Sequence, residues 1–126
     1  MGEYTVHFRT VQESIDNATV AGFNNAGNTL SSTYAKASYI FRDRYGASLA
    51  YAKITGSSDT SYSSNANVPD TERWTPEVFW FPTQNVRVGL QFNIFTQYLG
   101  GTSNYAGTGR SASDNNATFL YLWLAF

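Results

Sequence analysis

The stretch from Val86 to Tyr98 constrains the fold of this chain more than any other feature of its sequence. Apolar and polar residues alternate along its thirteen positions, interrupted only by Phe95. A period of two is the pattern of a β-strand with one apolar and one polar face. An ordinary strand has about five or six residues, whereas a tilted strand needs about 9–11 residues to cross a bilayer. The stretch therefore predicts a strand long enough to span a membrane.

Five other stretches alternate in the same way, though less regularly. Pro76 interrupts one of them, and because proline cannot donate to a ladder we expect an irregularity there. The sequence thus predicts one domain over 1–126 with six antiparallel strands. Their expected ranges are 3–15, 29–41, 45–56, 71–81, 85–99 and 116–126.

The links between these strands alternate strictly between short and long. Arg42-Asp43-Arg44 and Pro82-Thr83-Gln84 are short enough for tight turns, whereas the links near 16–28, 57–70 and 100–115 are long and rich in Gly, Ser and Asn. In an up-and-down sheet all long links then lie at one end. Transmembrane barrels show this asymmetry, with short periplasmic turns and long extracellular loops. The chain is therefore expected to be all-β, an antiparallel up-and-down transmembrane β-barrel or a segment of one.

Composition agrees with a surface that meets lipid on one side and water on the other. Aromatic residues reach 17%, while charged residues make up only 13% against a usual quarter. The absence of cysteine excludes disulfides and thiolate metal sites within this chain. A net charge of −1 gives no reason to expect nucleic acid as a partner.

The last seven residues carry a resemblance to a known family. A terminal Phe126 preceded by Leu120, Leu122 and Leu124 at alternate positions resembles the signal that the outer-membrane assembly machinery recognises in a C-terminal strand. The similarity continues through 42–46, 82–91 and 109–116 and covers nearly the whole chain from about Tyr4. These segments resemble the C-terminal part of a proteobacterial outer-membrane β-barrel family with porin-like members. The resemblance implies a place in the bacterial outer membrane and a porin-like or structural barrel without a catalytic set.

Six strands are fewer than the eight or more of single-chain barrels. An open sheet leaves two bare edges, and unsatisfied backbone groups in lipid cost several kcal/mol each. Three arrangements remove the edges. In order of preference, the chain is a fragment of a longer barrel, it closes with another copy or another chain, or it closes alone.

Successive side chains of a strand point to opposite faces of the sheet, so one face is expected to meet lipid and the other the lumen. The lipid side is expected to hold Val86, Val88, Leu90, Phe92, Ile94, Leu120, Leu122 and Leu124. The lumen side is expected to hold His7, Arg9, Lys36, Ser38, Arg73, Glu77, Arg87, Gln91, Asn93 and Gln97. Four arginines and lysines against one carboxylate would attract anions. Alternatively, these charges pair with one another and only solvate the wall. The selectivity candidates are Arg9, Lys36, Arg73, Glu77, Arg87, Gln91 and Asn93.

Aromatic residues are expected to form two belts at the membrane interfaces, where amphipathic rings are favoured. The belt near the short turns would comprise Tyr39, Phe41, Tyr45, Trp80 and Phe126, and the opposite belt Tyr51, Trp74 and Tyr98. The simpler alternative is that aromatic residues favour strands anywhere.

The function expected from these features is passive passage of small solutes or structural support of a barrel wall. A second possibility is a sleeve around a partner such as a redox protein, gripped by Phe119, Tyr121 and Trp123. A third is a soluble lipocalin-like barrel that binds an apolar ligand, because the same alternation permits the two faces to be exchanged. The lone His7 has no catalytic partner pattern. No catalytic, cofactor-binding or metal-binding residues are expected.

Overall fold

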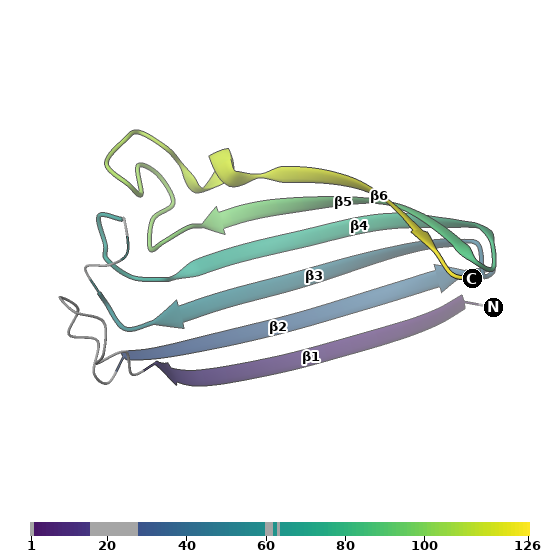
Figure 1. Cartoon of the computed structure of the whole chain (residues 1–126), viewed down its shortest axis with the longest axis horizontal. Coiled ribbons are helices and arrows are strands. Elements are labelled where there is room, and N and C mark those ends of the chain that lie inside the picture. Colours follow the sequence, from purple (N-terminus) through teal and green to yellow (C-terminus); the bar gives the residue numbers. More distant parts are fainter. Residues whose placement is uncertain (1, 16–27, 60–61, 63) are drawn as a thin grey trace.

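The computed structural model is a single antiparallel sheet of six strands in sequence order (Figure 1). It describes the backbone of residues 2–15 and 28, and residues 29–59, 62 and 64–126 in full. Each strand begins and ends within two residues of the range expected from the sequence. The strands are β1 (Gly2–Ile15), β2 (Asn28–Phe41), β3 (Tyr45–Gly56), β4 (Thr71–Thr83), β5 (Val86–Gln97) and β6 (Ala117–Leu124).

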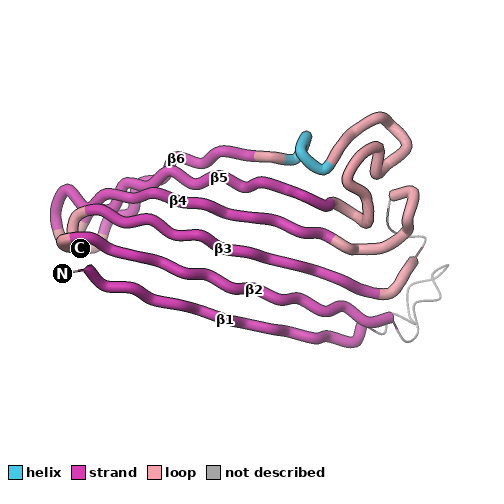
Figure 2. Tube along the Cα trace, turned by 180° about the vertical axis from the view of Figure 1, so that it is seen from behind, coloured by secondary structure: helices cyan, strands magenta, loops and turns pink. Residues whose placement is uncertain are grey.

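The two short turns and both termini lie at one end of the sheet, and the strand ends joined by the long links lie at the other (Figures 1 and 2). The first turn has Arg42 and Asp43 at positive φ and is closed by the Arg44 N–H, which donates to the Phe41 carbonyl at 3.2 Å. The second turn was expected over Pro82-Thr83-Gln84. That position is wrong, because β4 continues to Thr83, which pairs with Val86 across a tighter turn.

Pro76 interrupts the pairing of β4 with β5 but does not shift its register. The ladder has a gap between Trp74 and Glu77, with the same register on both sides. The missing N–H of proline accounts for such a gap. Register shifts fall instead near the two ends of β4, at Glu72/Arg73 and at Trp80/Thr83. The first shift pairs Gln97 with Glu72, so the simple parity that grouped Gln97 with the lumen residues does not hold there.

Cross-strand pairing defines two faces of the sheet. We call the face of Glu77 and its partners Ser48 and Gln91 the polar face, and the face of Val78 and its partners Ala47 and Leu90 the apolar face. The buried residues of β3 to β5, which are Ser48, Ala50, Glu77, Phe79, Gly89 and Asn93, all lie on the polar face. Among the residues whose side chains the structure describes, the apolar face exposes twelve large side chains. They are Tyr39, Phe41, Tyr45, Leu49, Trp74, Val78, Trp80, Phe92, Ile94, Leu120, Leu122 and Leu124.

A row of alternating glycines and aromatic residues crosses the polar face. Gly46 pairs with Phe79, Phe79 with Gly89, and Gly89 with Tyr121. A Cβ atom on Gly46 would lie 2.0 Å from the Phe79 ring, and one on Gly89 would lie 2.2 Å from the Tyr121 ring. Both rings therefore occupy the space that a side chain on the neighbouring strand would need. This lets Tyr121 lean from β6 toward β4.

The links 57–70 and 98–116 pack against each other at the far end of the sheet. The Asn65 N–H donates to the Tyr105 carbonyl, and the Gly100 N–H donates to the Asp70 carbonyl, both at 2.7 Å. Tyr105 is buried between them, and a short 3₁₀ helix, η1 (Ala112–Asn115), precedes β6. In the described part of the chain no helix has the length and apolarity to cross a membrane.

Candidate functional site

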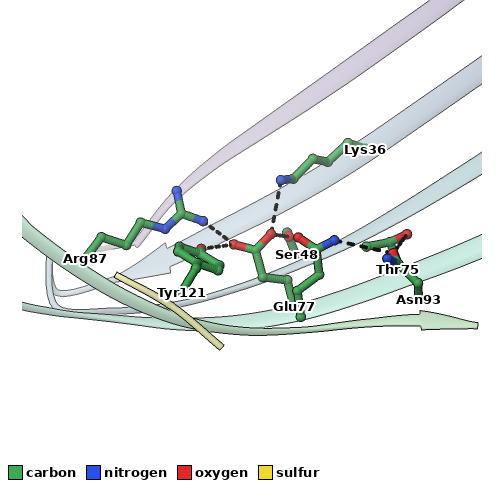
Figure 3. Close-up of polar contacts among 8 residues, drawn as sticks. Lys36, Ser48, Thr75, Glu77, Arg87, Asn93 and Tyr121 are labelled. Atoms are coloured by element: carbon green, nitrogen blue, oxygen red, sulfur yellow. Dashed lines mark hydrogen bonds and ion pairs between the residues drawn. The ribbon is translucent and has the colours of Figure 1, made fainter. Parts of the chain in front are cut away.

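Side chains from four strands converge on the carboxylate of Glu77, which lies in a fifth strand, β4 (Figure 3). Its partners are Lys36 from β2, Ser48 from β3, Arg87 from β5 and Tyr121 from β6. Strands in a sheet are about 4.8 Å apart, so β2 and β6 are separated by roughly 19 Å along the sheet. Contacts to one carboxylate from both sides are consistent with a sheet that curves toward the polar face. We call these five residues the Glu77 network.

The Glu77 network uses the full accepting capacity of the carboxylate. One oxygen accepts from the Arg87 guanidinium and the Tyr121 hydroxyl. The other accepts from Lys36 Nζ at 3.4 Å and from Ser48 Oγ at 3.3 Å. An ionised carboxylate offers about four lone-pair positions. Glu77 is only 5% exposed, and these four donors provide the pairing that a buried charge requires.

Aromatic rings hold Arg87 against the polar face of the sheet. Its guanidinium carbon lies 3.9 Å from the centre of the Phe79 ring and 5.5 Å from that of the Tyr121 ring. A guanidinium over a ring face gains a cation–π attraction of about 0.5–2 kcal/mol. The Glu77 carboxylate and the Phe79 ring therefore both favour the same flat position of Arg87.

A second polar cluster extends the Glu77 network along the strands. The buried Asn93 accepts through Oδ1 from Thr75 Oγ1 at 3.1 Å and from Gln91 Nε2 at 3.3 Å. Gln91 is the cross-strand partner of Glu77. The two clusters therefore form one polar strip across β2 to β6.

The remaining selectivity candidates lie apart from this strip. Arg73 forms no salt bridge with any described residue, and its guanidinium lies 5.8 Å from the Phe95 ring centre. Phe95, the exception to the alternation of β5, packs its ring edge against Tyr98 at 5.5 Å. The backbone of Arg9 pairs with Tyr34, while the side chains of His7 and Arg9 lie outside the described residues.

A pocket of about 460 Å³ opens beside the Glu77 network. Trp123, the cross-strand partner of Arg87, forms part of its wall and is 54% exposed. The pocket thus presents two cations and an indole ring around a carboxylate that is already occupied. Its lining residues are Lys36, Glu77, Phe81, Arg87, Gln91, Tyr121, Leu122 and Trp123.

Ser48 and Tyr121 are the two members of the Glu77 network that the sequence did not identify. Tyr121 was grouped with Phe119 and Trp123 as an apolar surface, and its hydroxyl was the available sign of a polar role. For Ser48, the only available sign was its position among the alternate residues of its strand. Both contacts depend on the registers of β3 with β4 and of β5 with β6, which no tight turn defines.

The apolar face has aromatic side chains toward both ends. Phe41 pairs with Tyr45, and Tyr45 with Trp80, near the short turns. Toward the other end the Tyr51 ring packs against the Trp74 ring, with 4.8 Å between the ring centres, and its hydroxyl donates to Glu72 at 2.9 Å. Past β6, Phe126 is fully exposed. Large apolar residues such as Leu49, Val78 and Leu90 lie between the two aromatic ends.

Comparison with known proteins adds no family: no protein-family model, no curated protein and no solved structure matches this chain. Among the described residues, no group of three or more His, Cys, Asp or Glu side chains is placed to hold a metal ion. Asp114 and Asn116 instead accept from the backbone N–H groups of Ser111 and Phe95 at 2.7 and 2.8 Å.

Proposed function

We propose that this chain forms part of the wall of a bacterial outer-membrane β-barrel, with the apolar face toward lipid and the polar face toward a water-filled lumen. The observation that carries the proposal is the opposite character of the two faces. One exposes a continuous set of large apolar side chains, and the other buries a charged network. The function would be passive passage of small polar solutes, or structural support of the barrel.

The height of the apolar face supports this proposal. Apolar residues of β5 extend from Val86 to Ile94 on that face. At 3.4 Å per residue these eight steps span roughly 27 Å along the strand. A tilt of about 40° leaves a height of roughly 21 Å, close to the band of about 25 Å in outer-membrane barrels.

Two other functions remain alternatives to this proposal. A lipocalin-like barrel would place the apolar face inside, yet the described strand residues that are buried lie on the polar face. A sleeve around a partner protein would use Phe119 and Trp123, which are about half exposed on the polar face of β6. Tyr121 between them already binds Glu77. The burial pattern therefore favours the lumen for the polar face.

Tryptophan quenching by lipids brominated in their acyl chains tests which face meets lipid. Trp74 and Trp80 lie on the apolar face and Trp123 on the polar face, and all three are at least 39% exposed. In vesicles, a chain that keeps only Trp80 is expected to lose at least half of its fluorescence to the bromine. A chain that keeps only Trp123 is expected to lose little.

The two single-tryptophan chains are matched controls, because both residues lie toward the short-turn end of the sheet on opposite faces. Bromine quenching of Trp123 alone would show that the faces are reversed. Equal fluorescence of both chains with and without bromine would show that the sheet does not enter the acyl region.

The partner that completes the barrel is proposed to be another copy or another chain bound at the sheet edges. Among the described strands, β1 pairs only with β2, and β6 pairs only with β5. These two edge strands run in opposite directions, so β6 of one chain can pair antiparallel with β1 of the next. Insertion would use the assembly machinery through Leu120, Leu122, Leu124 and Phe126.

Native mass spectrometry of the chain folded in detergent tests this arrangement. We expect particles that contain two or more chains, because closure removes the bare edges. A folded one-chain particle in detergent would contradict closure between chains. A well-folded monomer in plain buffer would contradict the membrane proposal itself.

A further inference from the structure

We propose that Glu77 determines the ionic specificity of the polar face by pairing with both Lys36 and Arg87, so that removing its charge would turn the adjacent pocket into an anion-binding site. The inference rests on the proposed function only for its physiological meaning. The binding property itself belongs to the folded sheet. It assigns to one residue the balance between passage of neutral polar solutes and passage of anions.

The charge count of the polar face supports this role. On β2 to β6, whose side chains the structure describes, the polar face carries three cations, Lys36, Arg73 and Arg87, and one carboxylate, that of Glu77. Two of the three cations contact that carboxylate. Because Arg73 lies near the opposite end of the sheet, the pocket contains two positive charges and one negative charge.

The geometry shows how Glu77 limits access to these cations. Lys36 and Arg87 approach different oxygens of one carboxylate, and their side chains are 27% and 29% exposed. A solute anion must therefore compete with an existing ion pair for each cation. Removing the carboxylate charge would leave both cations facing a pocket of about 460 Å³, within the usual size range of small-ligand sites.

Glu72 provides a matched control on the same strand. It carries the same charge but lies on the apolar face, where its carboxylate accepts from the Tyr51 hydroxyl. Its cross-strand partner is Lys53. Glu72→Gln and Glu77→Gln therefore change the net charge of the chain equally, and only Glu77→Gln changes the charge in the pocket.

Iodide quenching of Trp123 measures anion accumulation in the pocket without requiring conduction. The background is a chain with Trp74→Phe and Trp80→Phe, in which Trp123 is the only tryptophan. Glu77→Gln is expected to raise the iodide quenching constant about threefold, the factor for removing one negative charge at about 7 Å across water. Quenching by neutral acrylamide should not change.

Three results would overturn the inference. Iodide quenching could stay the same in Glu77→Gln, it could rise equally in Glu72→Gln, or acrylamide quenching could rise in parallel. Arg87→Gln supplies a second variant that keeps Glu77 and is expected to lower iodide quenching about threefold. If Glu77→Gln does not fold, unchanged quenching in Arg87→Gln overturns the inference.

Failure of the proposed function would look different. A sheet that never meets lipid leaves Trp80 unquenched by brominated acyl chains, while the iodide measurement still reports on the pocket of the folded chain. Normal bromine quenching of Trp80 with unchanged iodide quenching of Trp123 would remove the specificity role of Glu77 and leave the membrane wall in place.

Discussion

Replacing Val78 with arginine is expected to lower the free energy of unfolding in lipid vesicles by about 2–4 kcal/mol, the cost of a cation at the bilayer midplane of a barrel. Val78 is 53% exposed in the middle of the apolar face, between Ala47 and Leu90. No carboxylate among its cross-strand partners can pair with the new charge. Urea titrations of both chains in the same vesicles measure the difference.

Thr96→Arg is the control for Val78→Arg. Thr96 is exposed at the long-link end, beside Glu72. A cation near the interface is expected to cost about 0–1 kcal/mol. Equal losses at both positions would contradict a depth-dependent lipid contact. A loss below 0.5 kcal/mol for Val78→Arg would place the apolar face in water, as an ordinary surface substitution has that magnitude.

The sequence was sufficient to predict the strands because period two is a local property. The alternation assigned Lys36, Glu77 and Arg87 to one face of the sheet, and the structure brings their charged groups into contact. The turn at Arg42-Asp43-Arg44 also determines the register of β2 with β3, in which Ser38 pairs with Ser48. The residue pattern within each strand and the residues of the short turn thus predict the strands and the register of β2 with β3.

What could not be predicted depends on contacts across the long links. A link of a dozen or more residues sets no register, and a slip of one residue exchanges the faces of a strand. Ser48 faces Glu77 only through the register of β3 with β4, and Tyr121 reaches it only because Gly89 leaves room for its ring. The sequence alone therefore could not predict that Ser48 and Tyr121 donate to Glu77.

Two register shifts account for the other differences between the predicted and the observed strands. The shift at Glu72/Arg73 pairs Gln97 with Glu72, and the shift at Trp80/Thr83 moves the turn beyond Thr83. An extra residue at a bulge breaks strict alternation from that point onward. Parity therefore holds in the centre of the sheet, where Glu77 lies, and fails near its ends.

Replacing Glu77 with alanine is expected to lower the free energy of unfolding by about 2–3 kcal/mol. Removing one partner of a buried ion pair costs about 3–5 kcal/mol, and here the partly exposed Lys36 and Arg87 recover some hydration. Glu77→Gln should cost less, because the amide oxygen can still accept from the donors to one of the two carboxylate oxygens, such as Arg87 and Tyr121. Urea titration in detergent measures all three chains.

Glu72→Ala distinguishes the network from a general effect of charge. It removes a carboxylate from the same strand that has one hydroxyl partner, so we expect a loss of only about 0.5–1.5 kcal/mol, the net value of one hydrogen bond. Equal losses for Glu72→Ala and Glu77→Ala would contradict a special role of the Glu77 network in holding the sheet together. A larger loss for Glu77→Ala, partly recovered in Glu77→Gln, would separate its hydrogen bonds from its charge. The hydrogen bonds would then stabilise the wall, and the charge would remain available to set which ions the pocket admits.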